Sequence, residues 1–130
     1  MPINKQDTIC APATIPGTGA ISVIRLSGPE ALSIADKVVT CNGTPLSSTD
    51  GYRIRYGTVL DNDGETVDNV LVSVFRAPHS YTGEDSAEIS CHASGYIVQT
   101  IIGLLLDAGA RSAGPGEFTR RAFVNGKMDL

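Results

Sequence analysis

The sequence contains no tryptophan, only two histidines and only three cysteines among its 130 residues. The cysteines, Cys10, Cys41 and Cys91, are odd in number and widely spaced, and no C-x-x-C pair occurs. This pattern excludes a disulfide framework and a zinc site of the usual spacing. We therefore expect buried, reduced thiols in a cytoplasmic protein. We assign no metal-binding and no catalytic residue to this chain.

Long apolar runs are also missing. No stretch approaches the roughly 20 residues needed to span a bilayer, and the first residues lack the cationic and apolar regions of a signal peptide. We therefore expect no membrane partner. The chain has no G-x-x-x-x-G-K-[ST] phosphate loop, so these residues alone predict no GTP hydrolysis. A strand pattern follows Gly17-Thr18-Gly19, and that segment is interpreted as a turn.

Basic residues are in the minority, with 10 Lys and Arg against 14 Asp and Glu, a net charge of -4 and a pI near 5.0. An acidic domain lacks the long-range field that attracts a nucleic-acid backbone. RNA binding by this chain alone is therefore disfavoured. Hydrophobic residues make up 42% of the chain, enough for one folded domain with its own core.

Hydrophobic patterning predicts strands over 8–11, 20–26, 52–60, 68–76 and 87–92, and helices after residue 30, over 95–108 and over 115–124. The 52–60 and 68–76 strands form a hairpin through a D-G turn. The apolar run 70–75 predicts a central strand covered on both faces. Ser27 and Glu30 have the spacing of a capping box. The order predicts an α+β fold, a mixed β-sheet with helices packed on one side.

Alternation along 87–92 separates two faces of that strand. One face belongs to the core, and the other is a polar row made of Glu88, Ser90 and His92. This row is either a solvated outer face or a place where a partly desolvated carboxylate accepts hydrogen bonds from paired N–H donors. His92 has the chemistry of a base, but nothing in the sequence places a nucleophile beside it.

Arg25 interrupts an otherwise apolar strand and lies on the same side as Ile21 and Val23. An arginine in this position must reach solvent or find an anion. It therefore either extends to water at a sheet end or clamps a carboxylate or carbonyl group of a ligand.

The final stretch, 114–130, combines aromatic, cationic and acidic side chains in a way that suits neither a core helix nor a solvated loop. It predicts a surface segment whose cations are held by the apolar anchors Phe118, Phe123 and Leu130. The abrupt end predicts that more protein follows.

Five segments together carry a family resemblance. They are Asp7-Thr8-Ile9-Cys10-Ala11, Ile24-Arg25-Leu26-Ser27-Gly28-Pro29, Tyr81-Thr82-Gly83-Glu84-Asp85-Ser86-Ala87-Glu88, Ala108-Gly109-Ala110-Arg111 and the run from Pro115 to Leu130. The chain resembles the N-terminal domain of the tRNA-modification GTPase family (MnmE, also called TrmE). The resemblance covers essentially the whole chain, and its last motif is the most specific.

This resemblance implies a fold similar to the folate-binding domain of aminomethyltransferases. It implies that residues 1–120 bind a tetrahydrofolate and build a homodimer, and that residues 121–130 start the connection to a helical and GTPase region. The implied ligand is 5-formyl-tetrahydrofolate or 5,10-methylene-tetrahydrofolate. Potassium, magnesium and GTP belong to the GTPase domain of the longer protein. The family's catalytic cysteine lies near its C-terminus, and none of the three cysteines here matches it.

In the family, the longer protein is a hydrolase that works with a flavin-dependent partner. It modifies the wobble uridine of certain tRNAs with a carboxymethylaminomethyl-type group, and the folate is the implied one-carbon source. Three folate contacts carry over by motif. They are Arg25 of I-x-R-x-S-G, Glu88 of T-G-E-D-x-x-E and Lys127 of F-x-N-x-K-x-D-L.

The chain departs from the family pattern at two turns. The glycine-rich P-G-x-G-G-x-G turn reads Pro16-Gly17-Thr18-Gly19-Ala20-Ile21-Ser22, and H-G-G reads His92-Ala93-Ser94. Ala93 and Ser94 adopt a positive φ less easily than glycine, which predicts weaker affinity or a reshaped pocket if the turn needs that conformation.

Two alternatives to the folate-binding module stay open. One is an architectural dimerisation domain with a degenerate pocket. The other is a folate-dependent one-carbon transferase, for which Glu84 and Asp85 are the available carboxylates.

Overall fold

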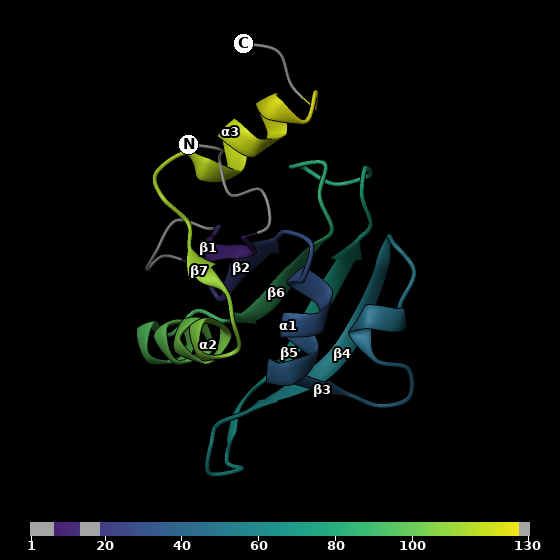
Figure 1. Cartoon of the computed structure of the whole chain (residues 1–130). Coiled ribbons are helices and arrows are strands. Elements are labelled where there is room, and N and C mark those ends of the chain that lie inside the picture. The colour runs from purple at the N-terminus through teal and green to yellow at the C-terminus, as the bar shows by residue number, and fades with distance from the viewer. Residues whose placement is uncertain (1–6, 14–18, 128–130) are drawn as a thin grey trace.

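The structure, a computed structural model, describes residues 7–13 and 19–127. This part of the chain forms one mixed sheet of seven strands in the order β3-β4-β5-β6-β2-β1-β7 (Figure 1). The strands are β1 (Ile9–Pro12), β2 (Ile21–Ser27), β3 (Val39–Cys41), β4 (Arg53–Leu60), β5 (Thr66–Phe75), β6 (Ser86–His92) and β7 (Arg111–Ser112). Neighbouring strands are antiparallel except for β1 and β7, which are parallel. The α+β class and the mixed sheet are confirmed.

Two helices, α1 (Ala31–Val38) and α2 (Gly95–Asp107), cover one face of the sheet (Figure 1). Their apolar sides pack on the inward side chains of the central strands, and Ile24, Val72, Ile89, Ile101 and Leu105 are fully buried there. A short 3-10 turn, η1 (Leu46–Ser48), adds Leu46 to this core. The predicted alternation of 87–92 is confirmed, because Ala87, Ile89 and Cys91 all lie in the core.

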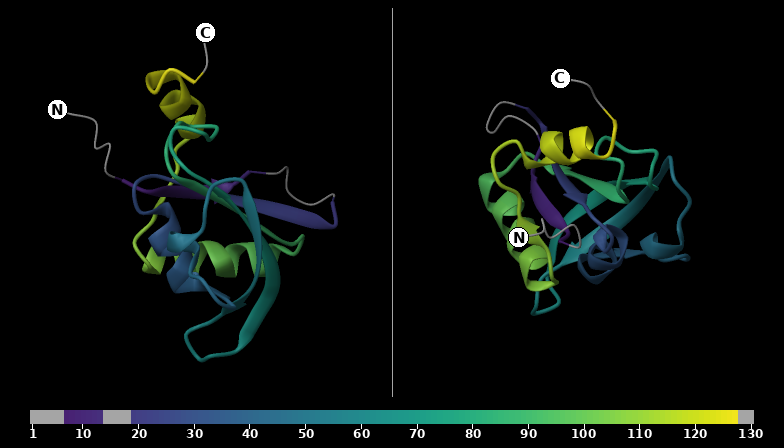
Figure 2. Two further views of the ribbon diagram at one scale, coloured as in Figure 1. Left: turned by 90° about the vertical axis from the view of Figure 1, so that its right-hand side faces the viewer. Right: turned by 45° about the horizontal axis from the view of Figure 1, so that its top comes forward.

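The last helix, α3 (Glu117–Val124), lies at the end of the sheet on the side away from α1 and α2 (Figure 2). Its Phe118 side chain reaches Arg25, which belongs to the face that the other helices leave open. The open face is called the outer face below, and α3 covers one end of it. The predicted boundary at residue 120 falls within this helix and stays a prediction.

The predicted hairpin of β4 and β5 is confirmed. The prediction that its second strand, β5, is covered on both faces is wrong. Along β5, Val70, Val72 and Val74 are buried while Leu71 is 48% exposed. Strict alternation arises because only one face receives helices. The apolar run therefore contributes Leu71 to an exposed outer face.

The predicted capping box before α1 is also wrong. Ser27 is the last residue of β2, and α1 begins after Glu30 without a side-chain cap. The Ser27 hydroxyl instead bonds to Thr82 and Glu84 from a distant loop. Two short strands, β3 and β7, were not predicted, because each has too few residues to show a period of two.

Candidate functional site

Arg25 and Glu88 face each other across β2 and β6 on the outer face. The Arg25 Nε donates to Glu88 Oε2 at 3.0 Å, and the two side chains are only 23% and 29% exposed. Strand register produces this meeting, because directly opposed residues on one face lie within side-chain reach. Two of the three predicted site residues are thus brought together, and the anion that Arg25 finds within the chain is Glu88.

Two aromatic rings enclose the guanidinium of Arg25. Its Cζ lies 4.9 Å from the centroid of the Tyr81 ring and 5.3 Å from that of Phe118. Tyr81 comes from the loop before β6, and Phe118 comes from α3. Cation–π attraction from two sides and an ion pair on a third fix the arginine in place. Sequence reasoning identified Phe118 only as an anchor and gave Tyr81 no role.

Glu88 keeps one carboxylate oxygen available. Its Oε2 is held by Arg25, whereas Oε1 accepts no hydrogen bond from the residues that the structure describes. An ionised carboxylate has about four lone-pair sites. The ion pair therefore presents Glu88 Oε1 as an oriented hydrogen-bond acceptor on a partly desolvated surface.

Lys127 does not touch this pair. It follows α3, where its backbone N–H donates to the Ala122 carbonyl at 2.8 Å. Its side chain lines a separate hollow of about 280 Å³ whose wall includes Tyr81. The third predicted residue is thus connected to the first two through one shared ring, that of Tyr81, which contacts Arg25 and lines the hollow of Lys127.

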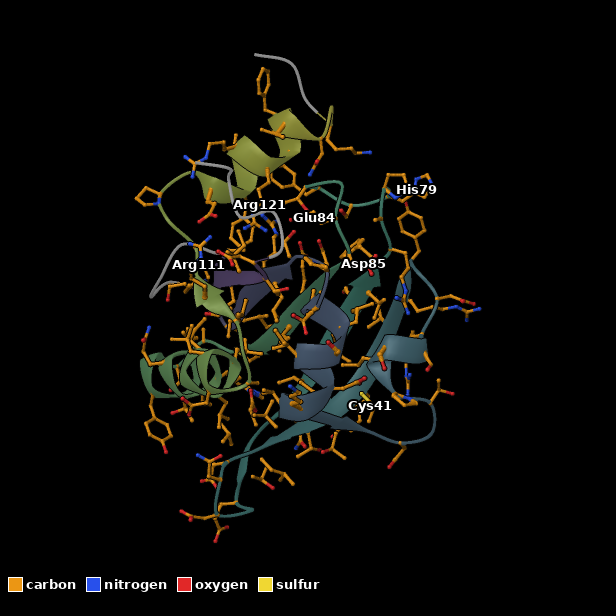
Figure 3. The ribbon with its side chains drawn as sticks, in the orientation of Figure 1. Cys41, His79, Glu84, Asp85, Arg111 and Arg121 are labelled. Carbon is orange, nitrogen blue, oxygen red and sulfur yellow. The ribbon has the colours of Figure 1, made fainter. Side chains whose placement is uncertain are left out.

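A partly buried polar network ties the Tyr81 loop to α3. Glu84 accepts from the Ser27 hydroxyl at 2.7 Å and from Arg121 at 3.2 Å. Arg121 also donates to Glu117, and Asn125 donates to the Thr82 carbonyl at 2.8 Å. Figure 3 shows Arg121 and Glu84 close together beneath α3. This network assigns the T-G-E-D carboxylate Glu84 a structural role.

Glu117 is the most perturbed carboxylate of that region. Hydrogen bonds from Arg111 lower its pKa to about 2, against the opposing effect of burial, and the Gly114 N–H adds to the lowering. The same contact raises the pKa of Arg111, and Asp7 adds to it. Both groups are therefore charged throughout the neutral range. Sequence reasoning missed this pair.

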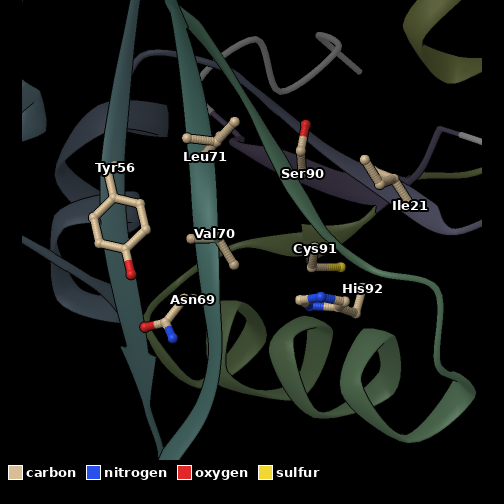
Figure 4. A pocket seen from close by; sticks show the side chains of 8 residues that line it. All are labelled: Ile21, Tyr56, Asn69, Val70, Leu71, Ser90, Cys91 and His92. Carbon is tan, nitrogen blue, oxygen red and sulfur yellow. The ribbon is translucent and has the colours of Figure 1, made fainter.

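A second hollow of about 330 Å³ lies on the outer face between β2 and β4 (Figure 4). Ile21, Tyr56 and Leu71 line it with apolar surface, and His92 stands at one side. The buried Asp68 carboxylate bonds to the His92 backbone N–H and to its Nδ1, both at 2.8 Å. Asp68 therefore orients an imidazole that remains largely exposed.

The surroundings of His92 supply no activated nucleophile within the described ranges. Its neighbour Cys91 points into the core, and burial raises the pKa of that thiol to about 11. Burial also raises the pKa of Cys10 to about 11 and increases that of Cys41. All three thiols are free and are protonated at neutral pH. Cys10 and Cys91 are buried, as predicted, whereas Cys41 is only partly buried, so the predicted burial is wrong for that residue.

The turn after β6 is built without the usual glycines. Ser94 has a φ of -124°, and its hydroxyl accepts from the Ile97 N–H at 3.3 Å as the N-cap of α2. Ala93 donates its N–H to the Ala20 carbonyl at 3.0 Å, and it does not have a positive φ. The two substitutions therefore fit a turn of ordinary backbone conformation. The Pro16-Gly17-Thr18 part of the other departure lies outside the described residues, as does Leu130.

Over the described residues, no group of three or more His, Cys, Asp and Glu side chains is placed to hold a metal ion. None of the helices described is long and apolar enough to cross a membrane.

Comparison with known proteins identifies the family. Residues 8–127 match the family model described as "GTP-binding protein TrmE N-terminus". The chain is 52% identical over 127 residues to "tRNA modification GTPase MnmE" of Parabacteroides distasonis. The aligned region covers 96% of this chain and 28% of that protein. It is 55% identical over 128 residues to the protein of the same name from Bacteroides fragilis, covering 97% and 27%. The corresponding protein of Moorella thermoacetica is 52% identical over 127 residues, covering 96% and 28%.

The fold and the site define an α+β domain that carries an oriented ion pair on an open sheet face. The chain belongs to the family of TrmE N-terminal domains. It spans little more than a quarter of the length of the curated relatives described above.

Proposed function

We propose that this chain is the tetrahydrofolate-binding and homodimerising N-terminal domain of a GTPase that modifies the wobble uridine of tRNA with a carboxymethylaminomethyl-type group. The observation that carries the proposal is the Arg25–Glu88 pair enclosed by Tyr81 and Phe118. The family membership supports the wider assignment.

The residues present suit a reduced pterin. A pterin presents adjacent N–H and NH₂ donors along one edge, and Glu88 offers an oriented acceptor with Oε1 available. Arg25 holds one oxygen of that carboxylate through its Nε and presents its remaining N–H donors to carbonyl oxygens. The Tyr81 and Phe118 rings provide flat apolar surface beside the pair. When bound, 5-formyl- or 5,10-methylene-tetrahydrofolate supplies the one-carbon unit.

Homodimerisation is supported by the exposed apolar residues of the outer face. Ile21, Ile54, Tyr56 and Leu71 are 62%, 66%, 61% and 48% exposed, and they come from three strands of one sheet face. Apolar side chains grouped in this way are typical of an interface. A second copy of the chain is the occupant proposed here, since a two-fold contact needs only one self-complementary patch.

The remaining partners belong to the longer protein. GTP, magnesium and potassium would act in its GTPase domain, and the flavin-dependent partner and tRNA would bind the assembled cytoplasmic protein. The acidic charge of this chain fits that division, because it offers no extended basic surface to tRNA.

Titration calorimetry with 5-formyl-tetrahydrofolate tests the ligand assignment. We expect saturable binding, weakened by about 1–3 kcal/mol in Glu88→Ala because a paired donor edge loses its acceptor. Glu65→Ala, on the exposed tip of the β4–β5 hairpin, is the control with the same charge change and should bind normally. A dimer that binds no folate would instead support the architectural alternative. Release of a one-carbon product from methylene-tetrahydrofolate would support the transferase alternative.

A further inference from the structure

The sequence contains two Asn-Gly pairs, Asn42-Gly43 and Asn125-Gly126. Such a pair is chemically reactive, because glycine has no Cβ to shield its own N–H and leaves the backbone free to bring that nitrogen against the preceding side-chain amide. Both asparagines are exposed, so access to solvent does not distinguish them. Their hydrogen bonds differ, and this difference leaves one pair open and holds the other.

Asn42 follows β3 at the start of the loop that leads to η1. Neither its side chain nor the Gly43 N–H makes a hydrogen bond within the described part of the chain. Gly43 has a φ of 83°, and nothing lies within 4 Å of a Cβ built there. One contact restrains the pair, an exposed hydrogen bond of 2.8 Å from Arg55 Nη2 to the Asn42 carbonyl. The long arginine side chain can follow that oxygen when the backbone rotates.

Asn125 is held at both of the groups that would react. Its Nδ2 donates to the Thr82 carbonyl at 2.8 Å, and the Gly126 N–H donates to the Phe123 carbonyl at 3.1 Å. Asn125 is also the C-cap of α3, with a φ of -88° and a ψ of 9°, and its own N–H donates to the Arg121 carbonyl. Attack by the Gly126 nitrogen therefore requires the first two bonds to break and the chain to rotate out of this turn.

We infer that Asn42 is a site of spontaneous deamidation and that the fold protects Asn125 from the same reaction. The Gly43 nitrogen attacks Cγ of Asn42, so an N–Cγ bond forms, the Cγ–Nδ2 bond breaks, and ammonia leaves with the proton of the Gly43 N–H. Water then opens the resulting cyclic imide. Cleavage of the new N–Cγ bond gives aspartate, and cleavage of the original main-chain bond gives isoaspartate. This reaction is independent of folate binding.

Isoaspartate at residue 42 weakens the support of the core beneath η1. Arg55 joins the two ends of this loop, since its Nη1 donates to the Thr49 hydroxyl at 2.7 Å and its Nη2 to the Asn42 carbonyl. The loop holds Leu46 fully buried. Isoaspartate routes the main chain through the side chain and so moves the carbonyl that Arg55 binds. We expect the isoaspartate form to unfold at a lower urea concentration than the unaltered chain.

The test follows both asparagines in one sample of the folded chain, incubated at mildly alkaline pH. Trypsin releases the two pairs in separate peptides, 38–53 and 122–127, and mass spectrometry measures the conversion of amide to acid in each. We expect Asn42 to convert at least about tenfold faster than Asn125, since two hydrogen bonds must open at Asn125 before the reaction begins. In unfolding urea the two rates should agree within about twofold, because the protection is lost.

Gly43→Asp tests the attacking nitrogen. Aspartate tolerates a positive φ, and its Cβ has open space there, so the variant shields the N–H while keeping the loop. We expect conversion of Asn42 to fall severalfold. Gly64→Asp is the matched control, because Gly64 has a φ of 81° and equally open surroundings, and it should leave the rate at Asn42 unchanged.

Three results would overturn the inference. One is conversion of Asn125 as fast as that of Asn42 in the folded chain. Another is an unchanged rate at Asn42 in Gly43→Asp, which would exclude the Gly43 nitrogen as the attacking group. The third is a folded chain in which neither asparagine converts while both convert in urea, which would show that the fold protects Asn42 as well.

Discussion

Arg111 donates from its Nη2 to Glu117 Oε2 at 2.7 Å, and this contact ties β7 to the first turn of α3. Glu117 Oε1 also accepts from the Gly114 N–H at 2.8 Å. The same carboxylate takes a third partner, Arg121, from the next turn of the helix. Glu117 is thus one of the points at which α3, which carries Phe118 into the site, is attached to the rest of the domain.

The first prediction concerns pH. The Glu117 pKa is lowered from 4.5 to about 2 by Arg111, so its contribution to stability is present above pH 4.5 and is lost as the pH falls toward 2. We expect Glu117→Gln to lower the free energy of unfolding at pH 7 by about 1–2 kcal/mol, a figure reduced for the exposure of Arg111. Urea unfolding at several pH values measures this. The prediction is contradicted if the Glu117→Gln variant loses stability below pH 4.5 as steeply as the unaltered chain. Glu65→Gln, which makes the same change at an exposed position, is the control.

The second prediction concerns the stacking of the planar Arg25 guanidinium on two aromatic rings. Arg25→Lys keeps the charge but loses the planar group that stacks on Tyr81 and Phe118. We expect binding of 5-formyl-tetrahydrofolate to weaken by about 1 kcal/mol, measured by calorimetry. Arg53→Lys makes the same change at an exposed position of β4 and should leave the affinity unaltered. If Arg25→Lys and Arg53→Lys lose the same amount of binding affinity, stacking of the Arg25 guanidinium does not contribute to binding.

The third prediction concerns self-association through the outer face. Leu71→Asp places a charge at the centre of the proposed interface, where burial of an unpaired carboxylate is costly. We expect a dimer in sedimentation velocity for the unaltered chain and a monomer for the variant. Leu106→Asp, at a residue of α2 with 37% exposure on the opposite side of the sheet, should leave the dimer intact. If only the α2 variant dissociates, the interface lies elsewhere.

The fourth prediction concerns the turn between β2 and α1. Gly28 has a φ of 144°, and a Cβ there would lie 2.6 Å from the Thr8 Cα. Gly28→Ala combines backbone strain with a clash against main chain, so we expect a loss of about 2 kcal/mol or more in thermal or urea unfolding. Gly103→Ala is the contrasting case, because nothing lies within 4 Å of its added Cβ in the middle of α2. It should stabilise the chain by about 0.5–1 kcal/mol. If both substitutions change the free energy of unfolding by the same amount, the backbone strain and the clash at Gly28 do not determine the stability of this turn.

Part of the site was predictable because periodicity is a local property. Alternation in 87–92 correctly assigned Glu88 and Ala87 to opposite faces, and the same reasoning assigned Arg25 to the side of Ile21. The pairing of Arg25 with Glu88 was not predictable from either strand alone. It depends on the register between two strands, which brings together residues that are 63 positions apart in the sequence.

Other features escaped prediction because they depend on what packs nearby. Ser27 matched a helix cap in the sequence, but its hydroxyl bonds to Thr82 from a distant loop. Nothing in the sequence indicated a role for Tyr81, yet its ring contacts Arg25 and lines the hollow of Lys127. Short-range patterns carry no information on which loop folds over which strand end.

The sequence itself determined the order of five strands and three helices, the inward and outward residues of β6 and the membership of the family, because each is expressed in local pattern or motif. The tertiary structure alone decided that Leu71 is exposed, that Arg25 meets Glu88 and that α3 brings Phe118 over them. The physical reason is that these facts arise from sheet register and from the helices covering only one face, and both are settled by packing between segments far apart in the chain.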